Sequence, residues 1–406
     1  MNTNDPPSTG HAGNAQPQVR PNLLRRMNER RILETVQARG GLSRAELVRL
    51  TGISPPTVSK LVRSLLAAHL LEEGAAPGDV LGRPAKILRL ANEAARVLGA
   101  VVDIRECSIA ATGLDGQLRA ERILRFATPD GYESLLEAIV KHAKRLMPRQ
   151  PGTCAAGGAA TLALGVTAPG LIDRRQQQML LSANLHQLDG RFLAGDLEER
   201  LGLRTILLHE TDALCLGERA FGQARGMDDF VLVDATGGLG AAIMMSGQVM
   251  AGHSGLAGEI GHITVDPGGR RCGCGNIGCL ETVASDLALA GMISEKIGKT
   301  VSFARAFELV RSGELRADAE IDRTLAYLAI GIAAIINIFN PAAVLVQARM
   351  FDVRPHAFEQ LLELVQRRAL SPILADCKIM RASGSKLQSA VAGTIHHLTS
   401  VLGPRV

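Results

Sequence analysis

Four side chains in one glycine-rich stretch, residues 258–282, could together bind a metal ion. Cys272, Cys274 and Cys279 follow the spacing Cys-x-Cys-x4-Cys, and His262 lies ten residues before the first of them. Thiolate and imidazole are the ligands that zinc prefers, and four of them complete the tetrahedron of a structural site. The glycines between the cysteines allow the tight turns that point several sulfur atoms at one centre. The sequence therefore predicts a structural Zn²⁺ ion held by these four residues.

The alternative for any cysteine is a buried free thiol, which packs like a small hydrophobic side chain. Three cysteines among glycines are poor core formers, so this alternative better suits the other four: Cys107, Cys154, Cys215 and Cys377. The odd total of seven cysteines, without the spacing of a disulfide framework, indicates a reducing compartment. We therefore expect a cytoplasmic protein.

The same stretch resembles the signature of the ROK family, which is named for repressors, open reading frames and kinases. The matching segments are Gly-Glu-Ile-Gly-His at 258–262 and Cys-x-Cys-Gly-x-x-Gly-Cys-x-Glu at 272–281. The resemblance extends over residues 95–406 and implies the fold of the ROK sugar kinases. That fold is α/β and actin-like (ribonuclease-H-like), with two lobes and a ligand cleft between them.

The apolar pattern of this body repeats one order of elements. The first set predicts strands at 97–104, 108–112 and 119–125, a helix at 133–146 and a buried strand at 161–167. The second set predicts strands at 230–234, 239–245 and 248–251, followed by helices that include 303–310 and 321–339. A last helix at 385–398 is expected to cross back to the first lobe. This duplication is the layout of the actin-like fold.

By resemblance, five residues correspond to the sugar site of the ROK kinases. Asn184 stands in the family's Ser-x-Asn-Leu stretch, and Asp212 matches the catalytic base, although the preceding family asparagine is Thr211 here. Such groups suit a sugar because each desolvated hydroxyl is both donor and acceptor. The other matches are Glu259, His262 and Glu281, so that His262 is expected to serve the metal and the sugar. Simpler roles stay open: a turn residue at Asn184, a helix N-cap at Asp212 and a surface carboxylate at Glu281.

The nucleotide-binding elements of the family are altered in this sequence. The first phosphate loop, Asp-x-Gly-Gly-Thr in the family, corresponds to residues 103–108, which read Asp-Ile-Arg-Glu-Cys-Ser. Glycine lets backbone amides approach a phosphate, whereas the Glu106 carboxylate would repel it. A later Gly-Gly pair is Gln347-Ala348 here, and the second phosphate loop survives in part at 235–240. We therefore expect a body that is not an enzyme, in which Asp212 is a vestigial base.

The segment before this body has the pattern of a helix–turn–helix. Apolar residues at helical spacing predict a first helix at 28–38. Ser43 and Glu46 form the capping box of a short helix at 44–50. After a turn at Gly52, a third helix begins at Ser54, with two prolines in its first turn, and continues to about residue 67. This order, with a third helix rich in Thr, Ser, Lys and Arg, is typical of DNA-binding proteins.

The third helix is expected to enter the major groove of DNA by its N-terminal end. Short strands at 70–74 and 87–90 flank a Gly-Arg-Pro loop and predict a wing, as in ROK repressors. Arg83 in this loop would lie in a narrow minor groove, where the negative potential is enhanced. The alternative is an interaction module with a solvated basic face. The residues expected to contact DNA are Pro56, Thr57, Ser59, Lys60, Arg63 and Arg83.

The distribution of charge agrees with a nucleic-acid partner for the first part of the chain only. Between residues 20 and 90, 13 lysines and arginines stand against 6 acidic residues, an excess of seven positive charges. Because the whole chain carries +5, the remainder sums to −2. The start of the chain lacks the layout of a secretory signal, and no apolar run reaches the ~20 residues of a membrane span. We therefore expect no membrane partner.

Together these observations predict a sugar-responsive transcriptional regulator, most simply a repressor, that binds operator DNA as a homodimer or a tetramer. Its effector would be a sugar or sugar phosphate. The alternatives are a sugar kinase with an added DNA-binding domain, and a regulator controlled by a protein partner. The expected division is a disordered arm at 1–20, a winged helix–turn–helix domain at 21–92, a first lobe at 95–210 completed by a closing segment at 385–406, and a second lobe with the zinc loop at 211–384.

Overall fold

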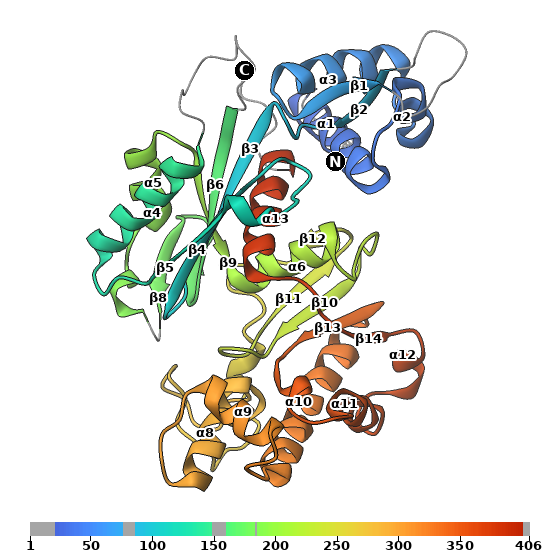
Figure 1. The fold of residues 1–406 in the computed structure, drawn as a ribbon. Coiled ribbons are helices and arrows are strands. Elements are labelled where there is room, and N and C mark those ends of the chain that lie inside the picture. The colour runs from blue at the N-terminus through green and yellow to red at the C-terminus, as the bar shows by residue number, and fades with distance from the viewer. Residues whose placement is uncertain (1–20, 76–85, 148–159, 183–184, 401–406) are drawn as a thin grey trace, which may run out of the picture.

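The computed structural model describes residues 21–75, 86–147, 160–182 and 185–400. A helical head, a first lobe and a second lobe follow one another along the chain (Figure 1). The head lies beside the top of the first lobe, and the second lobe lies below both. The predicted arm at 1–20 and the Gly-Arg-Pro loop lie outside the described residues, as does the end of the predicted closing segment.

The head contains the three predicted helices: α1 (Pro21–Arg39), α2 (Arg44–Thr51) and α3 (Pro55–Ala67). The first begins seven residues earlier than its apolar pattern indicated, because the side chains of residues 24–27 are exposed and carry no buried stripe. The capping box of α2 is present, since the Glu46 amide donates to Ser43 Oγ at 3.3 Å and the Ser43 amide donates to Glu46 Oε2 at 2.8 Å. Gly52 then ends α2 in the left-handed conformation with φ 67°.

The predicted wing strands are also present. β1 (Leu71–Ala75) and β2 (Lys86–Leu90) pair antiparallel, with Leu71 opposite Leu90. Leu88 in β2 also bridges to Leu42, so that the sheet is tied to the loop before α2. A winged helix–turn–helix therefore occupies the basic part of the chain.

The first lobe is built on a five-stranded sheet of order β5-β4-β3-β6-β9. β3, β4 and β5 are antiparallel neighbours, whereas β6 and β9 continue the sheet parallel to β3. The predicted strand at 119–125 is wrong over its first half, because residues 120–122 form a 3-10 turn before β5 begins. The elements are β3 (Ala95–Val101), β4 (Glu106–Thr112), β5 (Ile123–Ala127), α4 (Tyr132–Leu146), β6 (Ala160–Ala168), β7 (Leu171–Asp173), β8 (Gln178–Leu181), α5 (Leu193–Leu201) and β9 (Thr205–His209).

The second lobe repeats this plan with the order β12-β11-β10-β13-β14. Again three antiparallel strands come first, and two parallel strands, β13 and β14, complete the sheet. Its strands are β10 (Phe230–Asp234), β11 (Gly240–Met245), β12 (Gln248–Val249), β13 (Ala343–Gln347) and β14 (Lys378–Arg381). Its helices are α7 (Glu281–Ala284), α8 (Asp286–Ile297), α9 (Phe303–Arg311), α10 (Asp318–Phe339), α11 (Ala357–Gln366) and α12 (Ser371–Ala375).

Two helices lie between the sheets and pack on each other: α6 (Glu210–Phe221) and α13 (Lys386–Ser400). α6 covers the second sheet through Leu214 and Leu216, while α13 crosses back to the first sheet, as predicted (Figure 1). The approach of α13 is close. A Cβ atom on Gly99 of β3 would lie 2.8 Å from the backbone nitrogen of Val391, so only glycine fits there.

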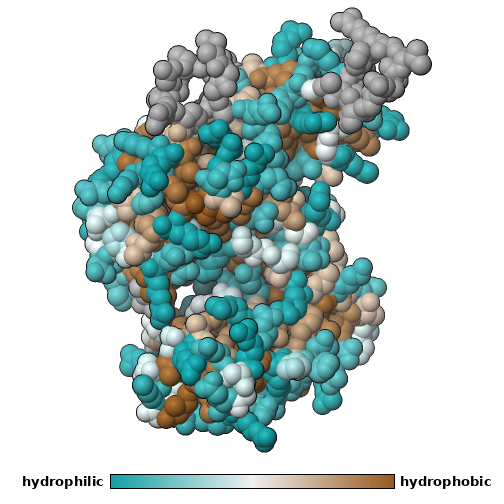
Figure 2. Space-filling view, viewed as in Figure 1, coloured by the Kyte–Doolittle hydropathy of each residue, from teal (hydrophilic) through white to brown (hydrophobic). Residues whose placement is uncertain are grey.

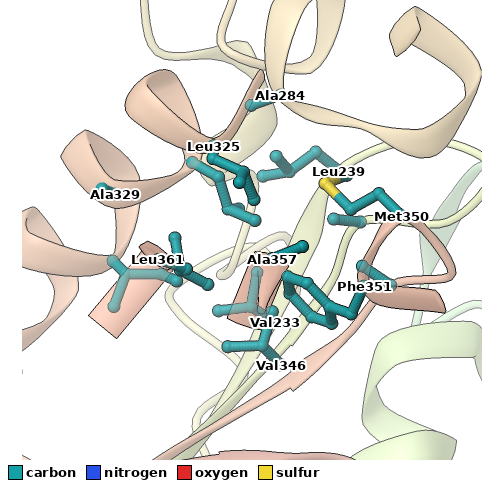
Figure 3. Close-up of a cluster of buried hydrophobic side chains, with 14 of the residues drawn as sticks. Val233, Leu239, Ala284, Leu325, Ala329, Val346, Met350, Phe351, Ala357 and Leu361 are labelled. Carbon is teal, nitrogen blue, oxygen red and sulfur yellow. The ribbon is translucent and has the colours of Figure 1, made fainter. Parts of the chain in front are cut away.

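The largest apolar core lies on the outer face of the second sheet (Figure 3). Val233 and Val346 point from the sheet toward Leu325 of α10 and Leu361 of α11, and all four are essentially buried. α10 is long and apolar enough to span a membrane by length and composition alone, yet 56% of its apolar window is buried inside the structure. Such burial is the environment of a core helix.

The head shares a core with the body. Ile32, Leu33 and Val36 of α1 belong to the same apolar cluster as Val391 and Ile395 of α13. Polar contacts join the same surfaces, since Arg219 of α6 lies 3.9 Å from Glu34 and Arg30 donates to the Gly247 carbonyl at 3.4 Å. The orientation of the head is therefore set by α6 and α13, the two helices between the lobes.

Candidate functional site

The four predicted metal ligands converge. The ligand atoms of His262, Cys272, Cys274 and Cys279 all lie within 4.8 Å of one another. Cys274 Sγ is 3.7 Å from Cys279 Sγ, and Cys272 Sγ is 3.7 Å from His262 Nδ1. A tetrahedral zinc ion with Zn–S bonds of about 2.3 Å separates its sulfur ligands by about 3.8 Å. The donor set and these spacings fit a tetrahedral metal ion.

The backbone around this cluster is a narrow turn held by its own hydrogen bonds. The Cys272 amide donates to the Asn276 carbonyl at 2.8 Å, and bridges connect Arg271 with Ile277 and Thr264 with Cys279. Gly278 has φ 72°, and a Cβ atom there would lie 1.6 Å from the Asp266 carbonyl oxygen. Glycine is therefore required at this position to bring Cys279 back to the cluster.

A second cluster, which we name the sugar-side cluster, lies next to the metal ligands and joins both lobes. It comprises Arg174, His209, Asp212, Glu259, His262 and Glu281. Arg174 follows β7 of the first lobe, and its Nη2 lies 2.8 Å from Asp212 Oδ2 on α6. Figure 2 shows a hollow in the surface between the upper part of the molecule and the second lobe. The arginine and the aspartate thus form an ion pair across the two lobes.

His262 connects the two clusters through its two ring nitrogens. Nδ1 is on the side of Cys272, while Nε2 lies 3.7 Å from Glu259 Oε2. The other oxygen of Glu259 lies 3.9 Å from His209 Nε2. One imidazole can therefore bind a metal and orient a carboxylate of the neighbouring cluster.

Glu281 lies at the start of α7, where it is half-buried rather than a freely exposed surface carboxylate. Its Oε2 accepts from the Leu239 amide at 3.2 Å, and its Oε1 accepts from the Cys272 thiol at 3.3 Å. Gly238 approaches closely, since a Cβ atom there would lie 2.7 Å from Glu281 Oε2. The structure brings Asp212, Glu259, His262 and Glu281 together; Asn184 lies outside the described residues.

Burial changes the protonation of this cluster. It raises the pKa of Asp212 to about 6, although Arg174 opposes the shift. Burial, with a smaller contribution from the Arg174 charge, lowers the pKa of His209 to about 4. His209 is therefore neutral near pH 7, and its Nδ1 lies 2.8 Å from Thr211 Oγ1. Two buried polar atoms in the cluster, Asp212 Oδ1 and Arg174 Nε, have no hydrogen-bond partner among the described residues.

Sequence comparison missed Arg174 and His209. Arg174 stands in a polar turn far along the chain from Asp212, and only the apposition of the lobes brings it to the aspartate. His209 ends β9 directly before α6. Ligands of α/β proteins bind at the C-terminal ends of parallel strands, so the position of this histidine in the sequence could have identified it as a site residue. Thr211, which replaces the family asparagine, contacts His209 and not a neighbouring carboxylate.

Charged groups pair with one another beside Asp103, which begins the stretch aligned with the first phosphate loop. Lys386 at the start of α13 lies 3.2 Å from Asp103 Oδ2 and 2.5 Å from Glu210 Oε1. Burial alone would lower the pKa of Lys386, but the carboxylates of Glu210 and Asp103 raise it above its usual value. Asp234 ends β10 nearby, and burial together with Glu210 raises its pKa to about 6.

The predicted DNA-contacting side of α3 faces solvent. Pro56, Ser59, Lys60 and Arg63 are exposed and Thr57 is half-buried, whereas Val58, Leu61, Val62 and Leu65 face the core of the head. Neither Lys60 nor Arg63 forms an ion pair with any residue that the structure describes. Arg83 lies outside those residues. The exposed cations of α3 are thus available to a polyanion.

Comparison with known proteins places the chain in one family. The profile of the ROK family matches residues 102–399, and that of the MarR family matches residues 24–79. The chain therefore belongs to the ROK family. Its body has the actin-like fold of the sugar kinases of that family, and its head is a MarR-like helix–turn–helix.

The relatives include repressors of full length. The xylose repressor of Bacillus subtilis (strain 168) is 26% identical over 354 residues, covering 86% of this chain and 89% of the relative. The transcriptional repressor Mlc of Escherichia coli (strain K12) is 28% identical over 358 residues, covering 86% of this chain and 87% of the relative.

Two solved structures match different shares of this chain. A ROK family transcriptional regulator, described as a homolog of the E. coli MLC protein, is 25% identical and covers 94% of this chain and 98% of its own, with a TM-score of 0.79. A ROK hexokinase from Thermus thermophilus is 26% identical and covers 73% of this chain and 97% of its own, with a TM-score of 0.60. The enzyme's chain thus leaves about a quarter of this chain uncovered.

Proposed function

We propose that this protein is a sugar-responsive transcriptional repressor that binds operator DNA through its head. The proposal rests on one observation: the same chain has an exposed basic recognition helix and a body with the sugar-side cluster in its cleft. Full-length relatives named as repressors, one of them a xylose repressor, support it. The division into arm, winged helix–turn–helix domain and two lobes belongs to the same proposal.

DNA binding would use the N-terminal half of α3 in the major groove, with Thr57, Ser59 and Lys60 near the bases and Arg63 near the phosphates. Paired half-sites require a dimer. An exposed apolar patch on the second lobe supports this assembly, because Ile338 is 70% exposed and Leu370 59% exposed. The two are neighbours, since the Leu370 amide donates to Asn337 Oδ1 at 3.0 Å.

A sugar would bind at the sugar-side cluster. Its hydroxyls would supply the partners that Asp212 Oδ1 and Arg174 Nε lack within the described ranges, since a buried polar atom without a hydrogen bond costs about 1–3 kcal/mol. Glu259 and Glu281 would accept further hydroxyl protons. Because Arg174 and Asp212 belong to different lobes, a sugar between them would change the distance between the lobes.

The helix α6 connects the sugar-side cluster with the head and could transmit a change in the distance between the lobes. Asp212 lies in its first turn and Arg219, which contacts Glu34 of α1, in its last. Between them, Glu218 is buried and accepts from the amides of Ser383 and Gly384, directly before α13. A sugar acts on DNA binding only if it favours one arrangement of these helices over the other.

Zinc is the metal that the cluster of one histidine and three cysteines suits. His262, Cys272, Cys274 and Cys279 would complete its tetrahedron, so the ion would be structural. When bound, it would hold the loop that carries Glu259 and Glu281 against the cleft. The residues themselves would do the recognition.

Two other functions are less well supported. ATP-dependent sugar phosphorylation would need the phosphate region to accept a nucleotide, but Lys386 is already paired with Asp103 and Glu210 there. Control by a protein partner needs no sugar site, whereas four of the predicted sugar ligands stand together in this structure. We therefore favour a cytoplasmic regulator without catalytic activity.

Operator binding with and without sugar tests the main proposal. DNA fragments from the promoter beside the protein's own gene would be titrated with the protein, and then simple sugars would be added. The expected result is binding that one sugar weakens, and about tenfold weaker binding for Lys60→Ala at the same salt concentration. Arg311→Ala, at the end of α9, serves as the control. Equal affinity of the Lys60 variant and wild type would remove α3 from the proposal.

Metal analysis tests the zinc proposal. The purified protein should contain about one zinc ion per chain, as expected for a four-ligand structural site. Cys272→Ser should lose the ion and unfold at a lower temperature, while Cys377→Ser, which lies outside the cluster, should keep it. Wild-type protein without zinc but with a normal melting temperature would contradict the ligand set.

A further inference from the structure

A second polar pocket lies away from the cleft, where the head joins the first lobe. It has a volume of about 220 Å³ and is lined by Asn92, Glu93, Arg96, Arg119 and Arg122. Arg96 is the second residue of β3, directly after the segment that follows the wing, while Arg119 precedes the 3-10 turn before β5 and Arg122 ends it. Three guanidinium groups from two separate segments thus line one recess.

No carboxylate in the described part of the chain forms an ion pair with these three arginines. The guanidinium groups of all three have no hydrogen bond or ion pair with a residue in the described ranges. Arg96 and Arg122 are half-buried, so part of their hydration is lost. Burial and then the Arg122 charge lower the pKa of Arg96, which shows that like charges face each other there.

Unpaired cations that line one small pocket cost free energy unless an anion joins them. The single acidic group of the lining is Glu93, so the pocket carries a net charge of about +2 by residue type. A phosphate monoester carries about −1.5 to −2 at neutral pH. The planar fork of arginine also matches phosphate oxygens in a bidentate manner.

We propose that Arg96, Arg119 and Arg122 form a binding site for the phosphate group of a small phosphorylated metabolite. This site is separate from the sugar-side cluster and does not depend on the sugar-responsive function. A recess of about 220 Å³ lined by two half-buried arginines and the exposed Arg119 suits a small ligand better than the backbone of a DNA duplex, which needs a continuous exposed surface.

The position of the site gives it access to the head. Asn92 and Glu93 lie in the connection between β2 and β3, and their amides donate to Glu72 Oε2 of β1 at 3.0 and 3.2 Å. Both residues also line a larger cavity of about 820 Å³ between head and body. A phosphate held by Arg96 would therefore contact the segment that sets the position of the wing.

Calorimetry with inorganic phosphate, at constant ionic strength adjusted with chloride, tests the proposal on the full-length protein. Wild type should bind phosphate, and Arg119→Ala/Arg122→Ala should bind it at least about tenfold more weakly, because two charge-assisted contacts are lost. Arg122→Lys should be intermediate, since lysine keeps the charge but not the fork. Arg125→Ala is the matched control, because this nearby arginine is exposed and paired with Glu106.

A second arm distinguishes a free phosphate ester from the phosphates of DNA. The salt dependence of operator binding should be the same for wild type and the double variant if the pocket takes a small ligand. A slope reduced by about one for each arginine removed would assign the pocket to DNA and overturn the proposal. Wild type that responds to phosphate no more than to chloride would overturn it as well. Circular dichroism and unchanged operator affinity would confirm that the variants fold.

Discussion

The two sides of the interlobe cleft differ in how completely their charged residues are paired. On the sugar side, Asp212 and Arg174 form one ion pair, yet each keeps a buried polar atom that no described residue partners. On the nucleotide side, Lys386 is bound by Asp103 and Glu210. The first side has hydrogen-bonding capacity left for a ligand, whereas the second uses its own side chains where a kinase would place phosphates.

The proposed function, a regulator that binds sugar but not nucleotide, accounts for this difference. Carboxylates in a region that no longer accepted a nucleotide would be costly if they stayed unpaired. Here a lysine at the start of α13 supplies the positive charge. Since α13 also packs on α1 of the head, this region is part of the connection to the DNA-binding domain.

The largest expected effect concerns Asp212. Asp212→Ala should weaken sugar binding by about 10- to 150-fold, because a hydrogen bond to a charged group contributes about 1.5–3 kcal/mol and Arg174 loses its partner. Isothermal calorimetry with the sugar identified in the operator assay measures this. Sugar-free operator binding should persist, although its affinity can change if the ion pair holds the lobes.

Asp322→Ala is the control for this substitution. It removes an aspartate of the same lobe that pairs with Arg354 at 2.7 Å on the surface, where an ion pair contributes little. If sugar affinity fell equally in both variants, or not at all in Asp212→Ala, the sugar-side cluster would not be the sugar site.

A smaller effect is expected from pH. Because the folded protein raises the pKa of Asp212 to about 6, this carboxyl is mostly protonated at pH 5 and accepts hydrogen bonds poorly. Sugar affinity should therefore be about tenfold lower at pH 5 than at pH 7. The groups that face Asp212 are Arg174, Glu259, His209 and Cys215. Asp212→Asn, which cannot ionise, should lose this component of the pH dependence.

The free energy of unfolding should also depend on the ionisation of Asp212. It should fall as pH rises, whereas sugar affinity should increase. The folded state binds the Asp212 proton more tightly than the unfolded chain, whose pKa is near the ordinary 3.8. Its contribution to the free energy of unfolding therefore decreases as pH rises from about 4 to 6 and is constant above that range. The difference between wild type and Asp212→Asn in urea unfolding isolates it; an equal pH dependence of both proteins would contradict the assignment.

The sequence predicted most elements of the fold and most residues of the sugar side, but not the contacts of Arg174 and Lys386 that distinguish the two sides of the cleft. The cysteine spacing predicted the metal cluster because its ligands lie close in the chain, and the capping box predicted α2 for the same reason. Arg174 and Lys386 were not recognised, since each meets its partner only when the two lobes and α13 are assembled. The strand expected from residue 119 begins at Ile123 instead. Residues 119–122 are bent away by a 3-10 turn, which places two arginines at the second pocket.

The smallest effect is expected on the nucleotide side of the cleft, where adding Mg-ATP should change nothing. Mg-ATP should neither bind to wild-type protein nor raise its melting temperature in samples that bind sugar, and no sugar phosphate should form. A triphosphate would meet the carboxylates of Asp103, Glu210 and Asp234, and the lysine among them is already paired. Lys386→Ala should lower stability by leaving these carboxylates unpaired, and it should still not bind ATP. ATP-dependent turnover by wild type would show that the internal ion pairs open for a nucleotide, and the contrast between the two sides of the cleft would no longer hold.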